Sequence, residues 1–412
     1  MDPGLSMVTN RRMELSGSTK NPEDSLWTSE ASCVSDRLVG KRTIVAATAA
    51  VPPSVSRSWM QNTLRSHFSH ARHHLTGIQY KEDTRTFISQ EFANYGLHVL
   101  LQTFPTPIEN VTGQNIIGIL KGKNFGRLAD TIWGIAAHYD TMPNTRGVDD
   151  NGSGMVAMLQ AAQILSAKGQ PENTILFLAF DLEEWERGVT ACVHGVCGSK
   201  AFVDQWLPWY FNMTYGVADD QSLKRLLGGV IVLDTVMNFN NSDFSQTVPA
   251  GMQQAFPNSY AKIVANNNRG NFLFEVDRPD DQQLASVFST AWKRPSTIEF
   301  PLNSIQLPIT GALTRLPAYV IRRVSTFLRS DHKSFWDRGY AAIFLTDTGD
   351  FRGSMSDCYH AVCDNMAAVT DDKLKFLEKV TQALIDTIGP LSSLSGHRPT
   401  TQISATDGLP IG

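Results

Sequence analysis

The sequence predicts an α/β protein with a mainly parallel (mixed) central sheet and helices on both faces. Three observations predict this fold. Apolar runs of strand length recur along the chain, segments with helical spacing of apolar residues separate several of them, and charged residues follow many of the runs directly. Strands that alternate with helices are typical of a parallel sheet covered on both sides. With 412 residues and 42% hydrophobic content, the chain can build a sizeable core.

The elements are predicted in the following order. Two helices, at residues 57–72 and 81–95, come first, and Gly96 is placed as a stop signal for the second. Three strands then follow, HVLLQTF from His98, NIIGILKG from Asn115 and TIWGIAAHYD from Thr131, and a turn joins the last two. A helix, MVAMLQAAQIL from Met155, comes next. Three more strands are TILFLAFDLEE from Thr174, GGVIVLDTVMN from Gly228 and YAAIFLTDTG from Tyr340. Residues 240–330 are less regular and contain helices at 259–267 and 280–292, and an amphipathic helix at 371–388 ends the fold.

Composition divides the chain into three parts. Residues 1–56 are rich in Ser, Thr, Pro and Gly with little periodicity, which predicts a disordered N-terminal segment. Residues 57–390 carry the periodic pattern and form one domain, and residues 391–412 are predicted to be a loose C-terminal tail. No internal repeat is found.

Charge and hydropathy restrict the partners. A net charge of -4 and a pI near 6.2 provide no broad electropositive face for nucleic acid or an anionic membrane. No apolar run reaches the roughly 18 residues that a membrane span needs. We therefore expect small or peptide-like substrates, no nucleic acid and no membrane span, while the oligomeric state stays open.

The cysteines and sequons bear on the compartment. Cys192 with Cys197 and Cys358 with Cys363 are close pairs that suit short-loop disulfides, although unpaired thiols remain the alternative, and Cys33 stands apart. Sequons occur at Asn110, Asn212 and Asn240. These features favour the secretory pathway, whereas the first 25 residues do not fit a signal peptide, so the compartment stays open.

The stretch from Ile132 to Gly154 resembles half of a metal site. An apolar strand ends in His138 and Asp140, and Asp149 and Asp150 follow before a Gly-Ser-Gly turn into a helix. In open α/β sheets, ligands bind beyond the carboxyl ends of the strands. Five residues lie just past successive strands and are expected to converge at one edge: His138, Asp150, Glu184, Asp234 and His360.

These residue types indicate zinc. Two histidines and three carboxylates suit a borderline metal, and five ligands exceed the four that one structural zinc takes. Two ions that share a bridging carboxylate fit the number better, and such ions lower the pKa of a bound water from about 15.7 toward 7. Glu183, directly before the ligand Glu184, is the candidate general base. Asp140, two residues after His138, is the candidate acceptor of the imidazole's second N–H.

An ordered set of segments carries a family resemblance. AHYDT, GVDDNGSG, FDLEE followed by GSKAF, VLD, SDHKSF and YHAVCDN resemble, in order and spacing, the zinc aminopeptidases of the M28 peptidase family. The match covers roughly residues 80–390. It implies a phosphorylase/hydrolase-like zinc-peptidase architecture for the predicted catalytic domain at residues 57–390.

The resemblance also implies roles for individual residues. It implies two zinc ions bridged by Asp150, with His138, Glu184, Asp234 and His360 completing the ligands and Glu183 as catalytic acid and base. The family places a non-proline cis peptide after the bridging residue, here Asp150 to Asn151. Tyr359, beside the last histidine, matches a residue that steadies the tetrahedral intermediate in some relatives.

The chain also departs from the family pattern. The insert WERGVTACVHGVC after Glu184 is longer than usual and is expected to shape the substrate pocket, although its His194 is interpreted as an ordinary loop residue. Asp331 and His332 in SDHKSF are expected to support the site without holding metal.

Three alternative functions were weighed against an aminopeptidase. A glutaminyl-peptide cyclotransferase-like enzyme would use one zinc, but this chain keeps the peptidase form of the Asp-Asp-Asn-Gly-Ser-Gly turn. A serine hydrolase built on Ser153 would need Gly at position 151, where the chain has Asn. A catalytically inactive M28-like binding domain is disfavoured because all five ligands and Glu183 remain. Carboxypeptidase or dipeptidase action stays open as the nearest variant.

Overall fold

The computed structural model describes residues 53–106, 110–186, 189–190, 197–294 and 300–393. Eight strands form one sheet in the order β1-β2-β4-β3-β7-β10-β8-β9. Their bounds are β1 His98–Pro105, β2 Thr112–Leu120, β3 Ile132–His138, β4 Ile175–Phe180, β7 Leu227–Leu233, β8 Leu273–Asp277, β9 Leu302–Gln306 and β10 Ala342–Thr346. A separate pair, β5 Glu184–Glu186 and β6 Val189–Thr190, follows the end of β4.

The centre of the sheet is parallel. Strands β4, β3, β7 and β10 lie side by side in one direction, while β1, β2 and β8 join through antiparallel pairings. The predicted mainly parallel, mixed sheet is therefore confirmed. Two of its strands, β8 and β9, lie in the stretch that the sequence analysis read as irregular, and β4 separates β2 from β3.

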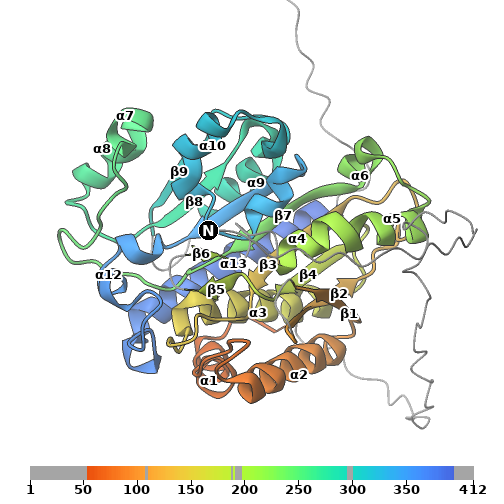
Figure 1. Cartoon of the computed structure of the whole chain (residues 1–412), viewed down its shortest axis with the longest axis horizontal. Helices are drawn as coiled ribbons and strands as arrows, with labels where there is room; N and C mark the ends of the chain where they lie inside the picture. The colour runs from red at the N-terminus through yellow and green to blue at the C-terminus, as the bar shows by residue number, and fades with distance from the viewer. Residues whose placement is uncertain (1–52, 107–109, 187–188, 191–196, 295–299, 394–412) are drawn as a thin grey trace, which may run out of the picture. The chain divides into compact units, whose positions relative to one another are not determined.

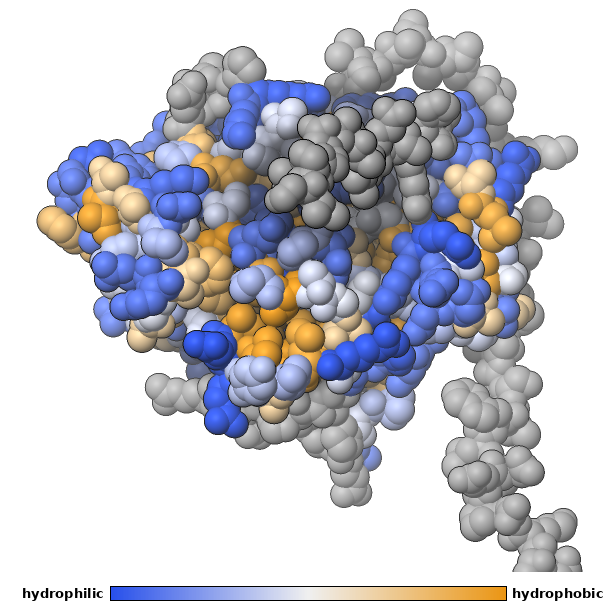
Figure 2. All heavy atoms as spheres, turned by 90° about the horizontal axis from the view of Figure 1, so that it is seen from above, coloured by the Kyte–Doolittle hydropathy of each residue, from blue (hydrophilic) through white to orange (hydrophobic). Residues whose placement is uncertain are grey.

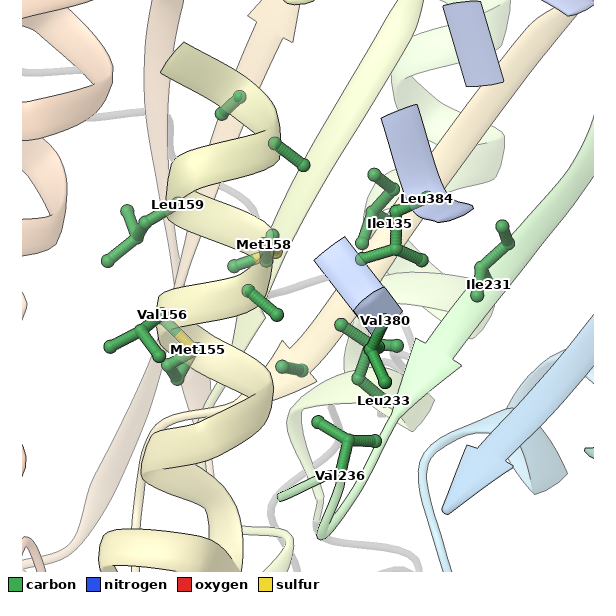
Figure 3. Packing of buried hydrophobic residues seen from close by; sticks show 14 of the residues in the cluster. Ile135, Met155, Val156, Met158, Leu159, Ile231, Leu233, Val236, Val380 and Leu384 are labelled. Carbon is green, nitrogen blue, oxygen red and sulfur yellow. The ribbon is translucent and has the colours of Figure 1, made fainter. Parts of the chain in front are cut away.

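Alternating strand residues supply two cores. Ile135 of β3 and Leu233 of β7 face the first core, which α3 and α13 cover, as Figure 3 shows. Because successive side chains in a strand point to opposite faces, the neighbouring Ala136 and Val232 belong to the second core. Continuous apolar strands are thus buried on both sides.

The helices divide between these two faces (Figure 1), as predicted. The first core is covered by α1 Arg57–His67, α2 Ile78–Asn94, α3 Gly154–Ala167, α9 Gln282–Trp292 and α13 Asp371–Ser393. The second contains side chains of α5 Leu207–Tyr215, α6 Asp220–Leu226, α7 Met252–Ala255, α8 Pro257–Ala265, α10 Ala318–Val324 and α11 His332–Asp337. Helix α4 Gly198–Ala201 contributes Ala201 to a small third cluster. Within the described residues, no helix combines the length and apolar character that crossing a membrane requires.

Some predicted boundaries were wrong. Helix α1 ends at His67 rather than at residue 72, and α2 begins at Ile78. The chain leaves the helix here because the backbone and side chain of Arg72 bond to the segment that follows β3. The predicted terminal segments, 1–56 and 391–412, lie largely outside the described residues, and the domain limits stay predictions.

Candidate metal centre

The structure brings the five predicted ligands together in two groups. In the first, His138 Nε2 lies 3.5 Å from an oxygen of Asp150 and 3.5 Å from an oxygen of Asp234. In the second, His360 Nε2 lies 3.3 Å from the other oxygen of Asp150 and 2.9 Å from Glu184 Oε1. The candidate ligand atoms of each group lie within 4.8 Å of one another. Asp150 belongs to both groups and offers a different oxygen to each histidine.

The strand ends explain this convergence. His138 is the last residue of β3, Asp234 follows β7 directly, and Glu184 comes four residues after the end of β4. These are neighbouring parallel strands, so their carboxyl ends meet at one edge of the sheet. His360 follows α12 Met355–Cys358 and approaches the same edge from a segment outside the sheet.

Burial makes this site electrostatically costly without a cation. The His138 and Asp150 side chains are each 1% exposed. Burial, followed by the charge of Glu184, raises the pKa of Asp150 to about 7. Burial lowers the pKa of His138, but the carboxylates of Asp234, Asp140 and Glu183 together outweigh it and hold that pKa well above its usual range. Negative charge is thus in excess at the buried edge of the sheet.

The donor atoms fit a metal such as zinc. Among the described residues, both ring nitrogens of His138, His360 Nε2 and one oxygen of Asp150 accept or donate no hydrogen bond although they are buried. Buried polar atoms are normally satisfied, so atoms left in this state point to a missing partner. Imidazole nitrogens with carboxylate oxygens are ligands that zinc accepts. The residues present therefore fit the expected metal.

Asp140 connects the first histidine with the two glutamates. One of its oxygens lies 3.5 Å from His138 Nδ1, the position expected from the sequence. Its two oxygens also accept hydrogen bonds from the backbone N–H groups of Glu183, at 3.2 Å, and Glu184, at 2.9 Å. Asp140 thereby fixes the turn after β4 against the end of β3.

Glu183 lies at the same site with a free carboxylate oxygen. The residue is 2% exposed, and its Oε1 has no hydrogen-bond partner among the described residues. Burial raises the pKa of Glu183 well above its usual range, although the neighbouring positive charge of His138 opposes this shift. A buried carboxyl with a raised pKa can both take and return a proton.

Tyr359 lies against the second histidine. Its ring stacks on that of His360 with 3.8 Å between centroids, and the guanidinium carbon of Arg329 lies 5.3 Å from the Tyr359 centroid. Burial, followed by the charge of Asp150, raises the pKa of Tyr359 well above its usual range. The phenol is therefore held in its protonated, hydrogen-bond-donating form.

Asp364 holds the bridging segment, and the sequence analysis did not single it out. Its two carboxylate oxygens accept hydrogen bonds from the backbone N–H groups of Asp149, at 2.8 Å, and Asp150, at 3.1 Å. The peptide between Asp150 and Asn151 is cis, as the family resemblance predicted. The Asn151 side chain donates to the backbone oxygen of Leu233, at the end of β7. The sequence signal for Asp364 is its position four residues after His360, within the segment YHAVCDN.

Arg72 was also missed, and no motif marks it. Its side chain is fully buried and donates to five backbone oxygens, those of Phe68, His70, Tyr139, Arg146 and Gly147. Its backbone N–H also donates to Thr141 Oγ1. Because residues 139 to 147 connect His138 with Asp149 and Asp150, Arg72 fixes the loop between the ligands. Burial lowers the pKa of Arg72 to about 10, so it remains charged at neutral pH.

Ser153 does not have the environment of a nucleophile. It is 0% exposed, and its hydroxyl donates to the backbone oxygen of Asp149 at 2.7 Å and accepts from the N–H of Val236 at 3.0 Å. A nucleophilic serine needs an adjacent base and access to substrate. The hydroxyl instead joins the bridging segment to the end of β7.

The remaining sequence candidates are placed as follows. Asp331 is buried, and burial raises its pKa to about 7 although the charge of His138 opposes this shift. His332 stacks on Phe344, and its Nε2 lies 2.9 Å from the Phe327 oxygen. Cys358 and Cys363 form a disulfide. Cys192 and His194, and with them the proposed Cys192–Cys197 loop, lie outside the described residues.

An apolar cavity adjoins the site. Asp234 and Tyr359 line it on the metal side, and its walls are largely hydrophobic, from Val248, Met252, Ile263, Phe274, Val276, Phe327 and Phe344. Most of these residues come from the region between 240 and 330 that the sequence analysis placed beside the site. The face drawn in Figure 2 shows hydrophobic surface set among hydrophilic side chains.

A model of one known peptidase family matches most of this chain. The model of peptidase family M28 matches residues 115–385, which contain all five candidate ligands and Glu183. The chain belongs to peptidase family M28. The family resemblance predicted from the ordered segments is confirmed.

Individual relatives are more distant. The chain is similar to the aminopeptidase YwaD of Bacillus subtilis, with 40% identity over 130 residues, or 32% of this chain and 24% of that protein. It is also similar to the vacuolar membrane protease of Eremothecium gossypii, with 29% identity over 53% of this chain and 19% of that protein. The chain therefore spans a quarter or less of the length of these two relatives.

Solved structures confirm the fold. A Zn-dependent exopeptidase from Parabacteroides distasonis matches with a TM-score of 0.53 and 16% identity, covering 82% of this chain and 99% of the other. A glutaminyl cyclase from Porphyromonas gingivalis matches almost equally, with a TM-score of 0.51 and 17% identity over 82% and 99%. Both the predicted peptidase and the cyclase alternative thus share this architecture.

Replacing Arg72 tests its role as the residue that positions the ligand loop. Arg72→Met should lower the free energy of unfolding by about 3 kcal/mol or more, because each buried carbonyl left without a donor costs about 1–3 kcal/mol. Arg72→Lys should recover part of the loss, since an ammonium group offers three donors. Denaturant unfolding measures both, and Arg65→Met, at an exposed position of α1, is the control. Equal stability of Arg72→Met and the control would exclude this role.

Proposed function

We propose that this chain is a metallopeptidase with two zinc ions that releases N-terminal residues from peptides. Membership of peptidase family M28 and similarity to an aminopeptidase support hydrolysis of peptide bonds. One observation supports the number of ions. The two oxygens of Asp150 face different histidines, as a carboxylate that bridges two metals must do.

The residues that would hold the ions follow from the two groups. His138, Asp150 and Asp234 would hold one ion, and Asp150, Glu184 and His360 would hold the other. When bound, zinc polarises a carbonyl oxygen and lowers the pKa of water to about 7. The chain supplies the remaining chemistry.

Proton transfer falls to Glu183. Its free Oε1 takes the proton of the attacking water, and the same carboxyl then returns it to the nitrogen of the leaving amine. Asp140 holds Glu183 in place by accepting a hydrogen bond from the backbone N–H of Glu183. The phenol of Tyr359 donates a hydrogen bond to the scissile carbonyl oxygen as negative charge develops there.

The adjoining cavity supports a preference for substrates. A side chain that enters it meets mainly aromatic and aliphatic walls next to Asp234 and Tyr359. Apolar side chains gain free energy by leaving water for such walls, whereas an acidic side chain would lose hydration. We therefore propose peptides with a large hydrophobic residue at the N-terminus as the substrate class.

The alternative functions predict different zinc contents and reactions. A glutaminyl-peptide cyclotransferase-like enzyme would hold one zinc and cyclise N-terminal glutamine, and an inactive binding domain would hydrolyse nothing. The two groups of facing ligand atoms favour the two-zinc peptidase over the cyclase. Retention of Glu183 at the site with a free oxygen favours an active enzyme.

Metal analysis separates these functions. The purified protein should contain two zinc ions per chain, release an N-terminal leucine from a peptide, and lose that activity in a chelator until zinc is restored. Elemental analysis together with assays on leucyl and glutaminyl peptides provides the measurement. One zinc per chain with cyclisation of the glutaminyl peptide would instead identify the cyclase.

The base is tested by Glu183→Gln. This change keeps the size of the side chain but removes its ability to take a proton, so kcat should fall by about a hundredfold or more. Zinc content should remain near that of the unmodified protein because Glu183 is not among the ligands. The control is Glu172→Gln, at the opposite end of β4. Full activity of the Glu183 variant would exclude its role as base.

The cavity is tested by Val248→Asp. A carboxylate on the cavity wall should lower kcat/KM for a leucyl peptide by about tenfold or more, because desolvating a charge beside an apolar side chain is unfavourable. Val264→Asp, at an exposed position of α8 that does not line the cavity, should leave kcat/KM unchanged. If the two variants hydrolyse leucyl peptides equally well, the substrate does not enter this cavity.

A further inference from the structure

The second ligand group depends on a segment that the sheet does not hold. His138 and Asp234 lie at strand ends, whereas His360 stands in a short loop after the four-residue helix α12. The backbone of His360 has φ +59°, in the left-handed region that residues with a side chain rarely adopt. In the described part of the chain, the backbone–backbone hydrogen bonds of this loop are local, such as Ala361 N–H to Cys358 O at 2.9 Å. Another constraint must therefore keep this histidine over Asp150.

A disulfide closes this loop. Cys358 and Cys363 are bonded, with 5.1 Å between their Cα atoms, and the loop between them contains Tyr359 and His360. The residue directly after it, Asp364, accepts the backbone N–H groups of Asp149 and Asp150. The Cys363 end of the loop is thus joined, through Asp364, to the backbone of Asp150. At the other end, Cys358 is the last residue of α12.

From this arrangement we infer that Cys358 and Cys363 are a positioning pair for the second metal group. The disulfide restricts the loop so that His360 faces Asp150 and Glu184. His360 Nε2 lies 3.3 Å from Asp150 Oδ2 and 2.9 Å from Glu184 Oε1. No strand-borne ligand of the first group lies in the loop, so His138 and Asp234 keep their places without it. Loss of the disulfide should therefore lower the affinity for the second ion more than for the first, because His360 belongs to the second group alone whereas Asp150 belongs to both. This inference rests on the proposed two-zinc function.

The disulfide can be opened by a reductant. Both cysteines are partly exposed, and Val362 between them is 61% exposed. A dithiol that reduces the bond gives up two electrons and two protons, which convert Cys358 and Cys363 to two thiols, and itself becomes a disulfide. Thiol–disulfide exchange at this loop would then alter the occupancy of one metal position.

Zinc titration of a double variant tests the inference. Cys358→Ala with Cys363→Ala should still bind the first zinc tightly, while its affinity for the second falls by about tenfold or more, the size of effect seen when groups that orient ligands are lost. Competition with a chromogenic chelator gives both affinities, and Val362→Ala is the matched control in the same loop. Unfolding of the metal-free proteins shows whether the double variant folds.

Each outcome has one meaning. Two zinc ions bound by the double variant with unchanged affinity would overturn the positioning role, even if its unfolding temperature falls. If the double variant does not fold, reduction and alkylation of the folded wild type, mapped to Cys358 and Cys363 by mass spectrometry, replaces it and must lower the second affinity equally. Less than two zinc in the oxidised wild type would contradict the proposed function instead.

Discussion

The carboxylates of Asp150, Glu184 and Asp234 are buried together at one edge of the sheet, and their ion-pair partners in the described part of the chain are two histidines. Neutral imidazoles cannot balance three buried negative charges, and charging both would cost their own desolvation. A divalent cation between these atoms removes the imbalance. Burial first, and then the neighbouring charge of Glu184, raises the pKa values of Asp150 and Glu183.

The groups that position the ligands act on backbone rather than on side chains. Asp140 accepts the N–H groups of Glu183 and Glu184, and Asp364 accepts those of Asp149 and Asp150. Arg72 does the converse and donates to the carbonyls of the loop before them. Charged groups make stronger hydrogen bonds than neutral ones, so a few side chains can fix loops that have no secondary structure. The site is therefore rigid where the sheet ends.

The sequence predicted His138, Glu184 and Asp234 because each ends or closely follows a continuous apolar strand. Runs such as ILFLAF and IWGIAAH are buried on both faces, and no helix start or turn signal competes with that interpretation. The short strands β8 and β9 were missed because LFEVD and LNSIQ carry polar residues on one face, where Glu275 bonds to Ser304 and Asp277 to Gln306. Only pairing with β10 and with each other makes these segments strands.

Arg72 and Asp364 could not be predicted for a different reason. A buried arginine that binds carbonyls looks the same in a sequence as one that faces water, because its partners are backbone atoms that every residue has. The helical pattern even placed Arg72 inside a helix that in fact ends at His67. By contrast, the residue types of the ligands themselves are informative, since histidine and paired carboxylates at strand ends have few structural reasons to converge.

The region from 240 to 330 both completes the sheet and lines the apolar cavity. It contributes two strands to the sheet, which tie it to β10, and at the same time lines the apolar cavity beside Asp234 and Tyr359. Phe274 and Val276 of β8 and Phe344 of β10 carry part of the cavity wall on the same sheet as β3 and β7. The candidate metal ligands thus follow β3 and β7, whereas β8 and β10 of the same sheet contribute to the cavity wall. Under the proposed function, substitutions in the 240–330 region would alter which substrate side chain binds without moving the candidate ligands at the ends of β3 and β7.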